Sequence, residues 1–349
     1  MTIQYFEGVR RGHPDKAADI LANRVAAEIA KLPGTDGNVR TAVEVMINAK
    51  SVIIAGEVSH YVPGLAERVA RDFLKEMDWG YGDNSELKIQ DFIVAQSDEI
   101  RDLVLSSEDL GAGDQGLMIG WATPENEYMM PLGFVAITEI MWALDKSDIK
   151  GLLSDGKGYI KYNIEENTAE VHISTQGTKD LDARALKDVV KSVLDKLGIE
   201  LIGFTHIIFQ HGGPYADTGL TGRKLACDTY GGIIGHGGGA TAGKELAKVD
   251  RSGVYLARAL AKAYAKKYDQ EATVKLGYVI GQTKPQSIEV YLEDGSVVVK
   301  TNDSIPTVAE LIKLFGKEGT TLPIPCEYSH FVSLSKELPW ETLDFGGRI

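Results

Sequence analysis

The stretch DTYGGIIGHGGGATAGKELAKVD, residues 228–250, contains seven glycines among its 23 residues, and its charged residues gather at the two ends. Glycine costs backbone entropy on folding, so such a run indicates a chain that must turn sharply or approach another group closely. Successive backbone N–H groups in a loop of this kind can cradle a polyphosphate. Lys244, Lys248 and Arg251 add positive charge, and Asp250 offers a metal ligand. We interpret the stretch as a loop that holds the phosphates of a nucleotide.

Length and charge limit the class of protein. At 349 residues with 44% hydrophobic content, the chain exceeds the usual size of one core, so two or three structural units are expected. A net charge of −13 argues against a nucleic-acid scaffold, because binding to a phosphate backbone requires a surplus of Lys and Arg. Residues 211–252 differ, since five Lys and Arg there outnumber four Asp and Glu. This local balance favours a small anionic ligand over a polymer.

The two cysteines, Cys227 and Cys326, form no CxxC spacing and no paired framework. Such sparing use of thiols indicates a reducing compartment, and we expect both to be small buried side chains. The first 16 residues contain no apolar run typical of a signal peptide, and no run of about 18 apolar residues suggests a membrane span. We therefore expect a cytoplasmic protein that binds neither nucleic acid nor membranes.

Hydrophobic spacing predicts a helix over residues 17–31, which Pro33-Gly34 ends, so that His13 and Asp15 lie at its N-terminal edge. Alternation of apolar and polar residues predicts strands, and the same order of hairpin and then helix occurs three times. In the first repeat the predicted strands are 39–47 and 52–58 and the helix is 65–77. In the second repeat the strands are 159–164 and 169–174 and the helix is 181–197. In the third repeat the strands are 274–280, 288–292 and 297–300, and a helix follows Pro306 and extends through residue 315. A further helix is predicted over residues 252–267, with Asp250 in its first turn or at its N-cap.

This order indicates an α+β protein built from three structurally similar hairpin and helix units. We expect units at residues 1–100, 110–211 and 212–349, with no long linker between them. Their hydrophobic sheet faces would be available to pack against each other or against a second subunit.

Two general nucleotide-binding motifs match the sequence, and neither has the right surroundings. Residues 111–116 match GxGxxG, but acidic and polar residues precede them where a buried strand should be, and Asp114 would repel a pyrophosphate. Residues 238–244 match GxxxxGK, but Glu245 stands where a P-loop has the Ser or Thr that binds Mg²⁺. We therefore predict neither a dinucleotide-binding fold nor a P-loop.

Carboxylates and cations lie together in the glycine-rich parts of the sequence. Carboxylates bind Mg²⁺ through oxygen, and Lys and Arg neutralise phosphate oxygens, so this combination indicates phosphate chemistry. The residues are His13, Asp15, Lys16, Asp114, Gln115, Asp217, Arg223, Lys224, Lys244, Lys248 and Asp250. No GxSxG, HExxH or Cys/His motif competes with that interpretation.

At these residues the chain closely resembles the S-adenosylmethionine synthetase (methionine adenosyltransferase) family, and the resemblance covers essentially the whole sequence. The matching segments are GHPDK at 12–16, GE at 56–57, QS at 96–97, GAGDQGLM at 111–118, GLTGRK at 219–224, DTYGG at 228–232, HGGGA at 236–240, GKELAKVDRSG at 243–253, YSHF at 328–331 and LPWE at 338–341.

The resemblance implies a reaction in which the methionine sulfur attacks C5′ of ATP and expels triphosphate, which is then hydrolysed to phosphate and pyrophosphate. A thioether has no proton to remove, so the catalyst must orient the sulfur and stabilise a highly charged leaving group. The family implies two Mg²⁺ per site, a K⁺, and a homo-oligomer, either a dimer or a dimer of dimers, with the sheets packed at the dimer interface and the active site between subunits.

The resemblance also implies roles for individual residues. Residues similar to the family's catalytic set are His13, Asp114, Lys157, Arg223 and Lys244. Residues similar to its ATP site are His13, Asp155, Lys157, Phe209, Asp217, Arg223, Lys224, Ala240 and Lys244. Those similar to its methionine site are Glu57, Gln96, Asp217 and Lys248. Asp15 and Asp250 resemble the Mg²⁺ ligands, and Glu44 resembles the K⁺-site glutamate.

Several positions depart from the family pattern. Arg10-Arg11 stands where the family usually has Ser-Glu, and Asn23 stands where it has an acidic residue. Gly156 replaces an alanine, Ile208 replaces an arginine, and His211 introduces an imidazole. Residues 97–110, which correspond to the family's gating loop, are shorter than usual and lack its proline. We expect these changes to affect selectivity and the gating loop and to leave the phosphate machinery intact. Two alternatives remain open, a different ATP-dependent transferase or kinase and a non-catalytic nucleotide-binding subunit.

Overall fold

The computed structural model describes residues 2–35, 39–96, 110–299, 304–317, 320–323, 326–333, 337–343 and 345. The predicted gating loop, apart from residue 110, lies outside these ranges, as does Lys300 of the predicted strand 297–300. Within the described residues, no helix combines the length and the apolar character needed to cross a bilayer.

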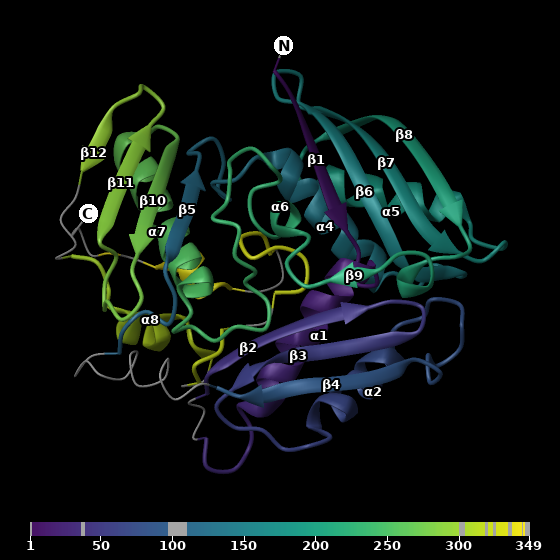
Figure 1. The fold of residues 1–349 in the computed structure, drawn as a ribbon. Coiled ribbons are helices and arrows are strands. Elements are labelled where there is room, and N and C mark those ends of the chain that lie inside the picture. Colours follow the sequence, from purple (N-terminus) through teal and green to yellow (C-terminus); the bar gives the residue numbers. More distant parts are fainter. Residues whose placement is uncertain are drawn as a thin grey trace.

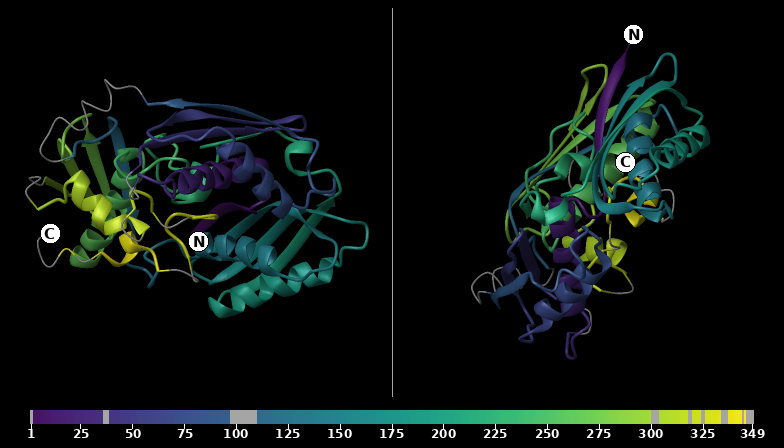
Figure 2. Two further views of the ribbon diagram at one scale, coloured as in Figure 1. Left: turned by 90° about the horizontal axis from the view of Figure 1, so that it is seen from below. Right: turned by 90° about the vertical axis from the view of Figure 1, so that its right-hand side faces the viewer.

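The described strands form three four-stranded sheets, each with helices on one face (Figures 1 and 2). The N-terminal sheet has the order β4 (Lys88–Ala95), β3 (Ser51–Val58), β2 (Thr41–Ile47), β9 (Gly219–Leu220). The middle sheet has the order β1 (Ile3–Val9), β6 (Leu152–Asn163), β7 (Thr168–Gly177), β8 (Glu200–Phe209). The C-terminal sheet has the order β12 (Val297–Val299), β11 (Ser287–Leu292), β10 (Ala272–Tyr278), β5 (Gly116–Ala122).

The helices lie behind the sheets in the view of Figure 1. α1 (Pro14–Ile29) and α2 (Leu65–Glu76) cover the N-terminal sheet, and α4 (Leu132–Lys146) and α5 (Ala183–Lys196) cover the middle sheet. α7 (Val249–Tyr268) packs on the C-terminal sheet, where it contacts α8 (Val308–Phe315) and α9 (Pro339–Thr342). Two short helices follow β8 in the chain: the 3-10 helix η1 (Gly213–Tyr215) precedes β9, and α6 (Leu225–Asp228) follows it.

The predicted α+β class and the three repeats of hairpin and helix are confirmed. The strands predicted at 39–47 and 52–58 are β2 and β3, which pair antiparallel with Val45 opposite Ile54. The helix predicted over 252–267 begins earlier, at Val249, so that Asp250 lies in its first turn as expected. Five of the strands, namely β1, β4, β5, β8 and β9, are not predicted by the sequence patterns. Three of these, β1, β5 and β9, belong to a different sheet from the strands next to them in sequence.

Each sheet takes one strand from outside the segment that supplies its other strands. β1 pairs with β6 of the middle sheet, β5 pairs with β10 of the C-terminal sheet, and β9 pairs with β2 of the N-terminal sheet. The units predicted at residues 1–100, 110–211 and 212–349 therefore each send one strand into a neighbour's sheet. This exchange brings residues from distant parts of the sequence to the edges of the sheets.

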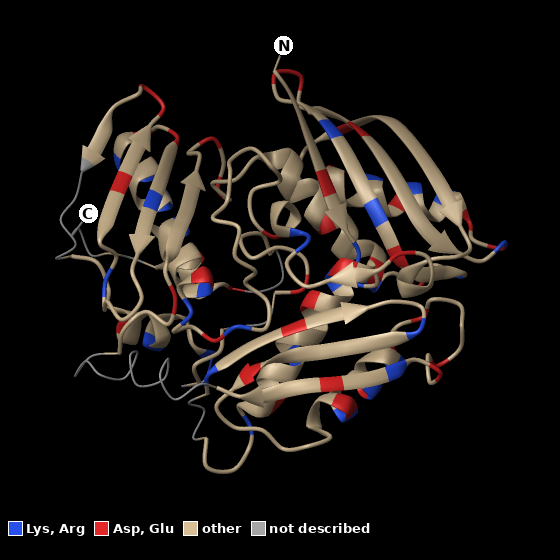
Figure 3. Ribbon diagram, viewed as in Figure 1, with Lys and Arg blue, Asp and Glu red and all other residues tan. Residues whose placement is uncertain are grey.

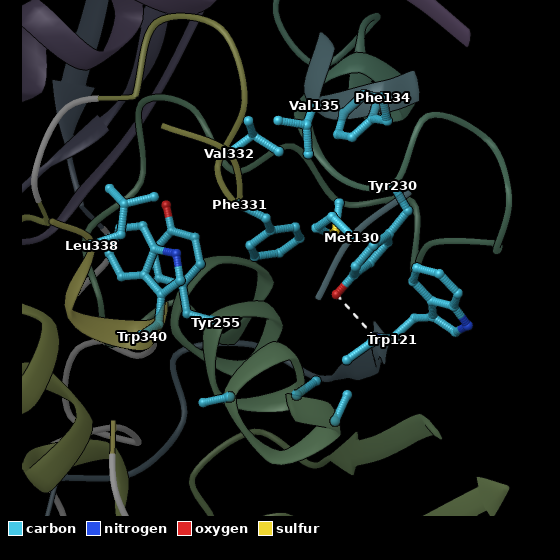
Figure 4. Close-up of a cluster of buried hydrophobic side chains, with 14 of the residues drawn as sticks. Trp121, Met130, Phe134, Val135, Tyr230, Tyr255, Phe331, Val332, Leu338 and Trp340 are labelled. Atoms are coloured by element: carbon cyan, nitrogen blue, oxygen red, sulfur yellow. Dashed lines mark hydrogen bonds between the residues drawn. The ribbon is translucent and has the colours of Figure 1, made fainter. Parts of the chain in front are cut away.

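The buried side chains form two clusters. One lies between the N-terminal sheet and α1 and α2, and the other joins the middle and C-terminal sheets with their helices. Part of the second cluster is aromatic (Figure 4): the rings of Tyr255 and Trp340 stack 3.7 Å apart, and Tyr230 stacks on Phe331 at 4.9 Å. The Tyr230 hydroxyl accepts a hydrogen bond from the backbone N–H of Trp121 at 3.1 Å. The glycine-rich stretch 228–250 is thus anchored in the core by its own tyrosine.

A buried ion pair connects α1 to this stretch. The Lys16 ammonium donates a hydrogen bond to the Asp228 carboxylate, and both side chains are closed to solvent. The backbone carbonyl of Asp228 accepts hydrogen bonds from the His330 N–H at 2.7 Å and the Ser329 hydroxyl at 3.1 Å. Asp228 therefore joins α1, α6 and the C-terminal segment.

We predict that Lys16→Ala destabilises the fold by about 3–5 kcal/mol, because it leaves the Asp228 charge buried without a partner. The double variant Lys16→Met/Asp228→Leu, which removes both charges, is expected to lose less. Urea unfolding followed by circular dichroism measures both. A Lys16→Ala protein as stable as the wild type would contradict the structural role of this pair.

Candidate active site

The segment GHPDK forms the start of α1. His13 is the N-cap residue with extended backbone, and its Nδ1 accepts a hydrogen bond from the Asp15 N–H at 3.3 Å. Pro14 occupies the first helical turn, where its missing N–H costs nothing, and Asp15 lies at the positive end of the helix dipole. The order of residues in this segment thus places an imidazole and a carboxylate side by side at a helix N-terminus.

Asp15 binds the loop that carries Arg223 and Lys224. Its Oδ1 accepts from the Leu220 N–H at 3.0 Å, and its Oδ2 accepts from Lys224 Nζ at 2.6 Å. Arg223 Nη1 lies 3.7 Å from Oδ1. Burial would raise the pKa of Asp15, but the hydrogen bonds from Lys224 and Leu220 hold the pKa below its usual value. Asp15 is therefore an anion at neutral pH, as a metal ligand must be.

His13 is neutral in this environment. Burial, followed by the positive charge of Lys224, lowers the pKa of His13 to about 3, and the charge of Asp15 opposes this only in part. Lys157 of β6 adds to the lowering. A neutral imidazole at this place can donate a hydrogen bond to an anionic ligand without adding a charge.

A second group of charged residues, Lys244, Asp250 and Glu44, lies on and beside β2. Lys244 Nζ is 2.6 Å from Asp250 Oδ2, and the backbone of Lys244 forms a bridge with Ala42 of β2. Glu44 follows two residues later on the same strand. Desolvation raises the pKa of Glu44, Lys244 opposes that effect, and the charge of Asp250 adds to it, so the three side chains interact.

Two glycines of the 228–250 stretch are explained by this packing. A Cβ at position 239 would lie 2.3 Å from Asp250 Cγ, and a Cβ at position 243 would lie 2.0 Å from the Val43 carbonyl oxygen. Gly243 also has a positive φ of 73°. These glycines therefore allow the loop to approach Asp250 and β2, which is a different task from wrapping a phosphate.

Two cations of the sequence interpretation are corrected by the structure. Lys16 was grouped with the phosphate-binding residues, but it is buried in the pair with Asp228. Arg251 was expected to add charge to the loop, but it is buried too and donates to the Asn23 Oδ1 at 3.0 Å and to the Lys244 carbonyl at 2.8 Å. Both are used to hold the backbone around the site.

Lys248 and Asp114 belong to neighbouring turns. Lys248 is the N-cap residue of α7, and its Nζ donates to the Gly113 carbonyl at 3.2 Å. The Gly113 N–H donates to the Ala247 carbonyl at 2.9 Å, which fixes the turn before β5 against the start of α7. Asp114 comes next in that turn, so the structure brings the predicted catalytic Asp114 close to the predicted methionine-site Lys248.

Four predicted nucleotide-site residues lie at one end of the middle sheet. Asp155 and Lys157 are near the start of β6, Phe209 is at the end of β8, and Asp217 is in the loop that follows β8. Asp155 Oδ2 accepts from the Gly213 N–H at 2.8 Å. Burial raises the pKa of Asp155 and the nearby charge of Asp217 adds to this, against the Gly213 hydrogen bond. Lys157 Nζ lies 3.6 Å from Glu7 Oε2 of β1, and Phe209 is the last residue of β8.

Two of the predicted methionine-site residues, Glu57 and Gln96, lie on or directly after strands of the N-terminal sheet. Glu57 of β3 is opposite Ala42, which bridges to Lys244 on its other side. Because neighbouring strands are about 4.8 Å apart, the backbones of Glu57 and Lys244 are about 10 Å apart. Gln96 follows β4, and its buried Oε1 has no hydrogen-bond partner among the described residues. Ala240 lies beside the 219–224 loop, since a Cβ at Gly222 would be 2.7 Å from that of Ala240.

The departures from the family pattern have structural partners. Asn23 accepts from the Gly243 N–H at 3.0 Å as well as from Arg251. His211 Nδ1 is 2.7 Å from the Tyr81 hydroxyl, whose ring stacks on Tyr215. Ile208 packs against the hydrophobic core, so it does not place a polar group beside Phe209.

Asp19 is a site-supporting residue that the sequence analysis missed. Its Oδ1 accepts from the Gly222 N–H at 2.8 Å, so Asp15 and Asp19 on one face of α1 both hold the 219–224 loop. The signal was available, because Asp19 is four residues after Asp15 and residues with that spacing lie on the same side of a helix.

No candidate residue lines the larger cavities that are found among the described residues. A cavity of about 590 Å³ lies between α1, α2 and the residues Lys317, Thr320, Leu322 and Pro323, and no candidate residue lines it. The cavity beside Asp250 and residues 236–239 has a volume of about 20 Å³, which is far too small for a nucleotide. In the described residues, moreover, no group of three or more His, Cys, Asp and Glu is arranged to hold a metal ion. The chemistry of the charged groups, and not the size of a cavity, identifies this region.

Comparison with known proteins agrees with these residues. Family models of S-adenosylmethionine synthetase match the chain with their N-terminal domain over residues 2–102, their central domain over 109–208 and their C-terminal domain over 211–317. The S-adenosylmethionine synthase of Mycoplasmopsis pulmonis is 34% identical, over 97% of this chain and 95% of its own. That of Wolinella succinogenes is also 34% identical with the same coverage, and that of Leuconostoc mesenteroides is 32% identical over 98% and 97%. The chain therefore belongs to the S-adenosylmethionine synthetase family.

Proposed function

We propose that this protein converts ATP, L-methionine and water to S-adenosylmethionine, phosphate and pyrophosphate. The observation that carries the proposal is the pair of carboxylate and cation groups beside β2: Asp15 with Arg223 and Lys224, and Asp250 with Lys244. Family membership supports the activity, and these groups are suited to a polyphosphate leaving group.

In the proposed reaction the methionine sulfur attacks C5′ of ATP in line with the departing oxygen. Sulfur needs no base, so the work of the protein is to orient the reactants and to neutralise the triphosphate. Lys224, Arg223, Lys244 and Lys157 would bind phosphate oxygens. Neutral His13 would donate a hydrogen bond to the oxygen that leaves C5′, and Asp114 would assist at the ribose end.

The donor set fits Mg²⁺. Asp15 is held as an anion, and the Asp250 oxygens lie at the start of a helix beside Lys244. Mg²⁺ commonly takes one or two protein carboxylates and completes its coordination with substrate phosphates and water, so a larger acidic cluster is not required. Bound there, the ions would supply positive charge to the phosphate oxygens. We propose two Mg²⁺ per site and a K⁺ at Glu44.

The remaining predicted contacts complete the substrate sites. Asp155, Phe209, Asp217 and Ala240 would border the nucleotide. Glu57, Gln96, Lys248 and Asp217 would bind methionine, and the unpartnered Oε1 of Gln96 is an acceptor suited to an ammonium group. The presence of only two cysteines among 349 residues supports our placing of the protein in the cytoplasm.

The open faces of the sheets suggest that a second copy of the chain completes the site. The strands carry few charged residues (Figure 3), and large apolar side chains on them are exposed, among them Phe92 and Ile207 at 57% each. Further examples are Tyr5, Val94, Leu117, Tyr159, Ile202 and Leu220. Apolar surface of this extent usually marks an interface. We propose a homodimer or a dimer of dimers that packs through these faces.

Incubation of the protein with ATP, methionine and Mg²⁺ tests the function. S-adenosylmethionine with phosphate and pyrophosphate is the expected product set. Formation of ADP would indicate a kinase, and binding of ATP without turnover would indicate a non-catalytic subunit.

Asp15→Asn and Lys244→Ala are each expected to lower kcat by about 100-fold or more, because each removes preorganised charge from the leaving group. Asp188→Asn and Lys187→Ala on the exposed face of α5 are the matched controls and should retain wild-type turnover. Near-normal kcat in both site variants would refute the assigned roles.

The pH dependence of stability should reveal the neutral state of His13. The folded pKa of about 3 lies below the unfolded value of 6.5. The unfolded chain therefore binds more protons between these values, and the contribution of His13 to stability is complete above pH 6.5 and is lost as the pH falls toward 3. The variant His13→Asn, which keeps an N-cap acceptor, should show a shallower loss of stability in that range by thermal melting. Identical slopes would contradict the buried neutral state.

Charge on the exposed sheet faces should separate the subunits. Phe92→Asp and Ile207→Asp are each expected to shift the protein toward monomer by light scattering and to lower activity with it. Tyr268→Asp, at an exposed aromatic residue of α7 outside the sheets, serves as control and should leave the assembly unchanged. A wild-type protein that is monomeric and fully active would overturn the proposed shared site.

A further inference from the structure

A break in the ladder between β6 and β7 lies directly before Gly156. Leu152 pairs with Gly177 and Gly156 pairs with Thr175, so three residues of β6 stand opposite one residue of β7. Backbone groups in such a bulge lose their partners in the ladder and need others. The bulge, residues 153–155, ends in Asp155 and is followed by Lys157, two residues that we assign to the nucleotide site.

Arg10 supplies the missing partners. Its Nη1 donates to the Leu153 carbonyl at 2.5 Å and to the Thr175 hydroxyl at 2.8 Å, and lies 3.4 Å from the Asp155 carbonyl. The Thr175 hydroxyl in turn donates to the Asp155 carbonyl at 3.1 Å. The backbone N–H of Arg10 donates to the Gly156 carbonyl at 3.0 Å. The buried Arg10 side chain thus binds the carbonyl groups at both ends of the bulge, while Ser154 between them donates its N–H to the Asp78 carbonyl at 2.8 Å.

Asp145, at the end of α4, fixes the other side of the guanidinium. Its Oδ1 accepts from Arg10 Nε at 2.8 Å and lies 2.7 Å from Nη2. Its Oδ2 accepts from the Arg11 N–H and from the Tyr328 hydroxyl, both at 2.9 Å. Arg10 and Asp145 are both buried, and their opposite charges compensate each other. The hydrogen bonds on both sides fix the orientation of the Arg10 guanidinium.

Gly156 leaves the space that Arg10 fills. A Cβ at position 156 would lie 2.8 Å from Arg10 Cδ, 2.9 Å from the Thr175 hydroxyl oxygen and 3.1 Å from the Ser174 carbonyl. The Thr175 hydroxyl is itself held by Arg10, so two of these three contacts depend on the arginine. The Arg10 side chain in this position therefore requires a residue without a Cβ at position 156.

Arg10 also reaches the start of α1. Its carbonyl accepts from the His13 N–H at 3.0 Å, and Gly12 lies against Ser154 of the bulge, where a Cβ at position 12 would be 2.4 Å from Ser154 Cβ. We propose that Arg10 is a positioning residue that sets Asp155 and Lys157 relative to His13 for nucleotide binding, and that it requires glycine at position 156. This inference rests on the proposed function, because it takes these three residues as nucleotide contacts.

Four variants test the inference: Arg10→Ser, Arg10→Lys, Gly156→Ala and the double variant Arg10→Ser/Gly156→Ala. Arg10→Ser and Gly156→Ala are each expected to raise KM for ATP on the order of 10- to 100-fold, because displacement of binding groups by about 1 Å has effects of this size. KM for methionine should rise less than KM for ATP, since Glu57, Gln96 and Lys248 lie outside the middle sheet and only Asp217 is shared with the ATP site. Arg10→Lys should retain the fold, because it keeps the charge beside Asp145, but should still raise KM for ATP.

Arg11→Ser is the matched control. Arg11 is adjacent in sequence, but its side chain pairs with Glu76 and Glu327 and does not contact the bulge. This variant should keep the wild-type KM for both substrates. In the double variant the rise in KM for ATP should be smaller than the product of the two single effects, because serine at 10 removes the contact with Arg10 Cδ, which is the shortest of the three that alanine at 156 would make.

The outcomes separate this inference from the proposed function. A wild-type protein that makes no S-adenosylmethionine would refute the function, and the same variants would then be compared by their dissociation constants for Mg²⁺-ATP. Equal ATP affinity or KM in wild type, Arg10→Lys and Gly156→Ala would overturn the positioning role. Strictly multiplicative effects in the double variant would overturn the pairing of Arg10 with Gly156. Equal losses for ATP and methionine would indicate a general effect on folding and would also reject the proposal.

Discussion

Lys16 and Asp228 form an ion pair closed to solvent, and much of the candidate site depends on it. Lys16 belongs to the first turn of α1, which also carries His13 and Asp15, and Asp228 opens the glycine-rich stretch that carries Lys244 and Asp250. More than 200 residues separate the two partners in sequence. A buried charge must keep its partner, so this pair fixes one part of the site relative to the other with little tolerance.

Buried arginines have a related task in this fold. The segments that carry the site are loops and bulges, whose carbonyl groups have no ladder partners. Arg10 holds the bulge in β6, Arg251 holds the Lys244 carbonyl, and Arg258 holds the carbonyls of Trp121, Tyr128 and Met129 while it pairs with Glu341. Guanidinium suits this role because its donors form a rigid planar fork. Buried arginines thereby satisfy backbone carbonyl groups that secondary structure leaves without partners, and two of the three lie beside candidate site residues.

Local patterns in the sequence were sufficient for the elements that pack on their neighbours in the chain. Periodicity and turn residues predicted the hairpin of β2 and β3, the helices α1, α2, α5 and α7, and the place of His13 at the N-terminal edge of α1. The strands β1, β5 and β9 could not be found in this way, because their partners β6, β10 and β2 are distant in sequence. Pairing over such distances leaves no local signal beyond a short apolar run.

The sequence by itself determined the residue types of the site: GHPDK, GLTGRK and the glycine-rich stretch contain the carboxylates and cations that phosphate chemistry needs. Only the tertiary structure decided which of those charges are buried as internal partners and which remain partly exposed in the candidate site. Lys16 and Lys224 are the same residue type, and each ends a motif similar to the family's. Lys16 is buried against Asp228, whereas Lys224 binds Asp15 beside His13. The difference arises from burial and from partners contributed by remote segments, and neither property is encoded in a residue's immediate neighbours.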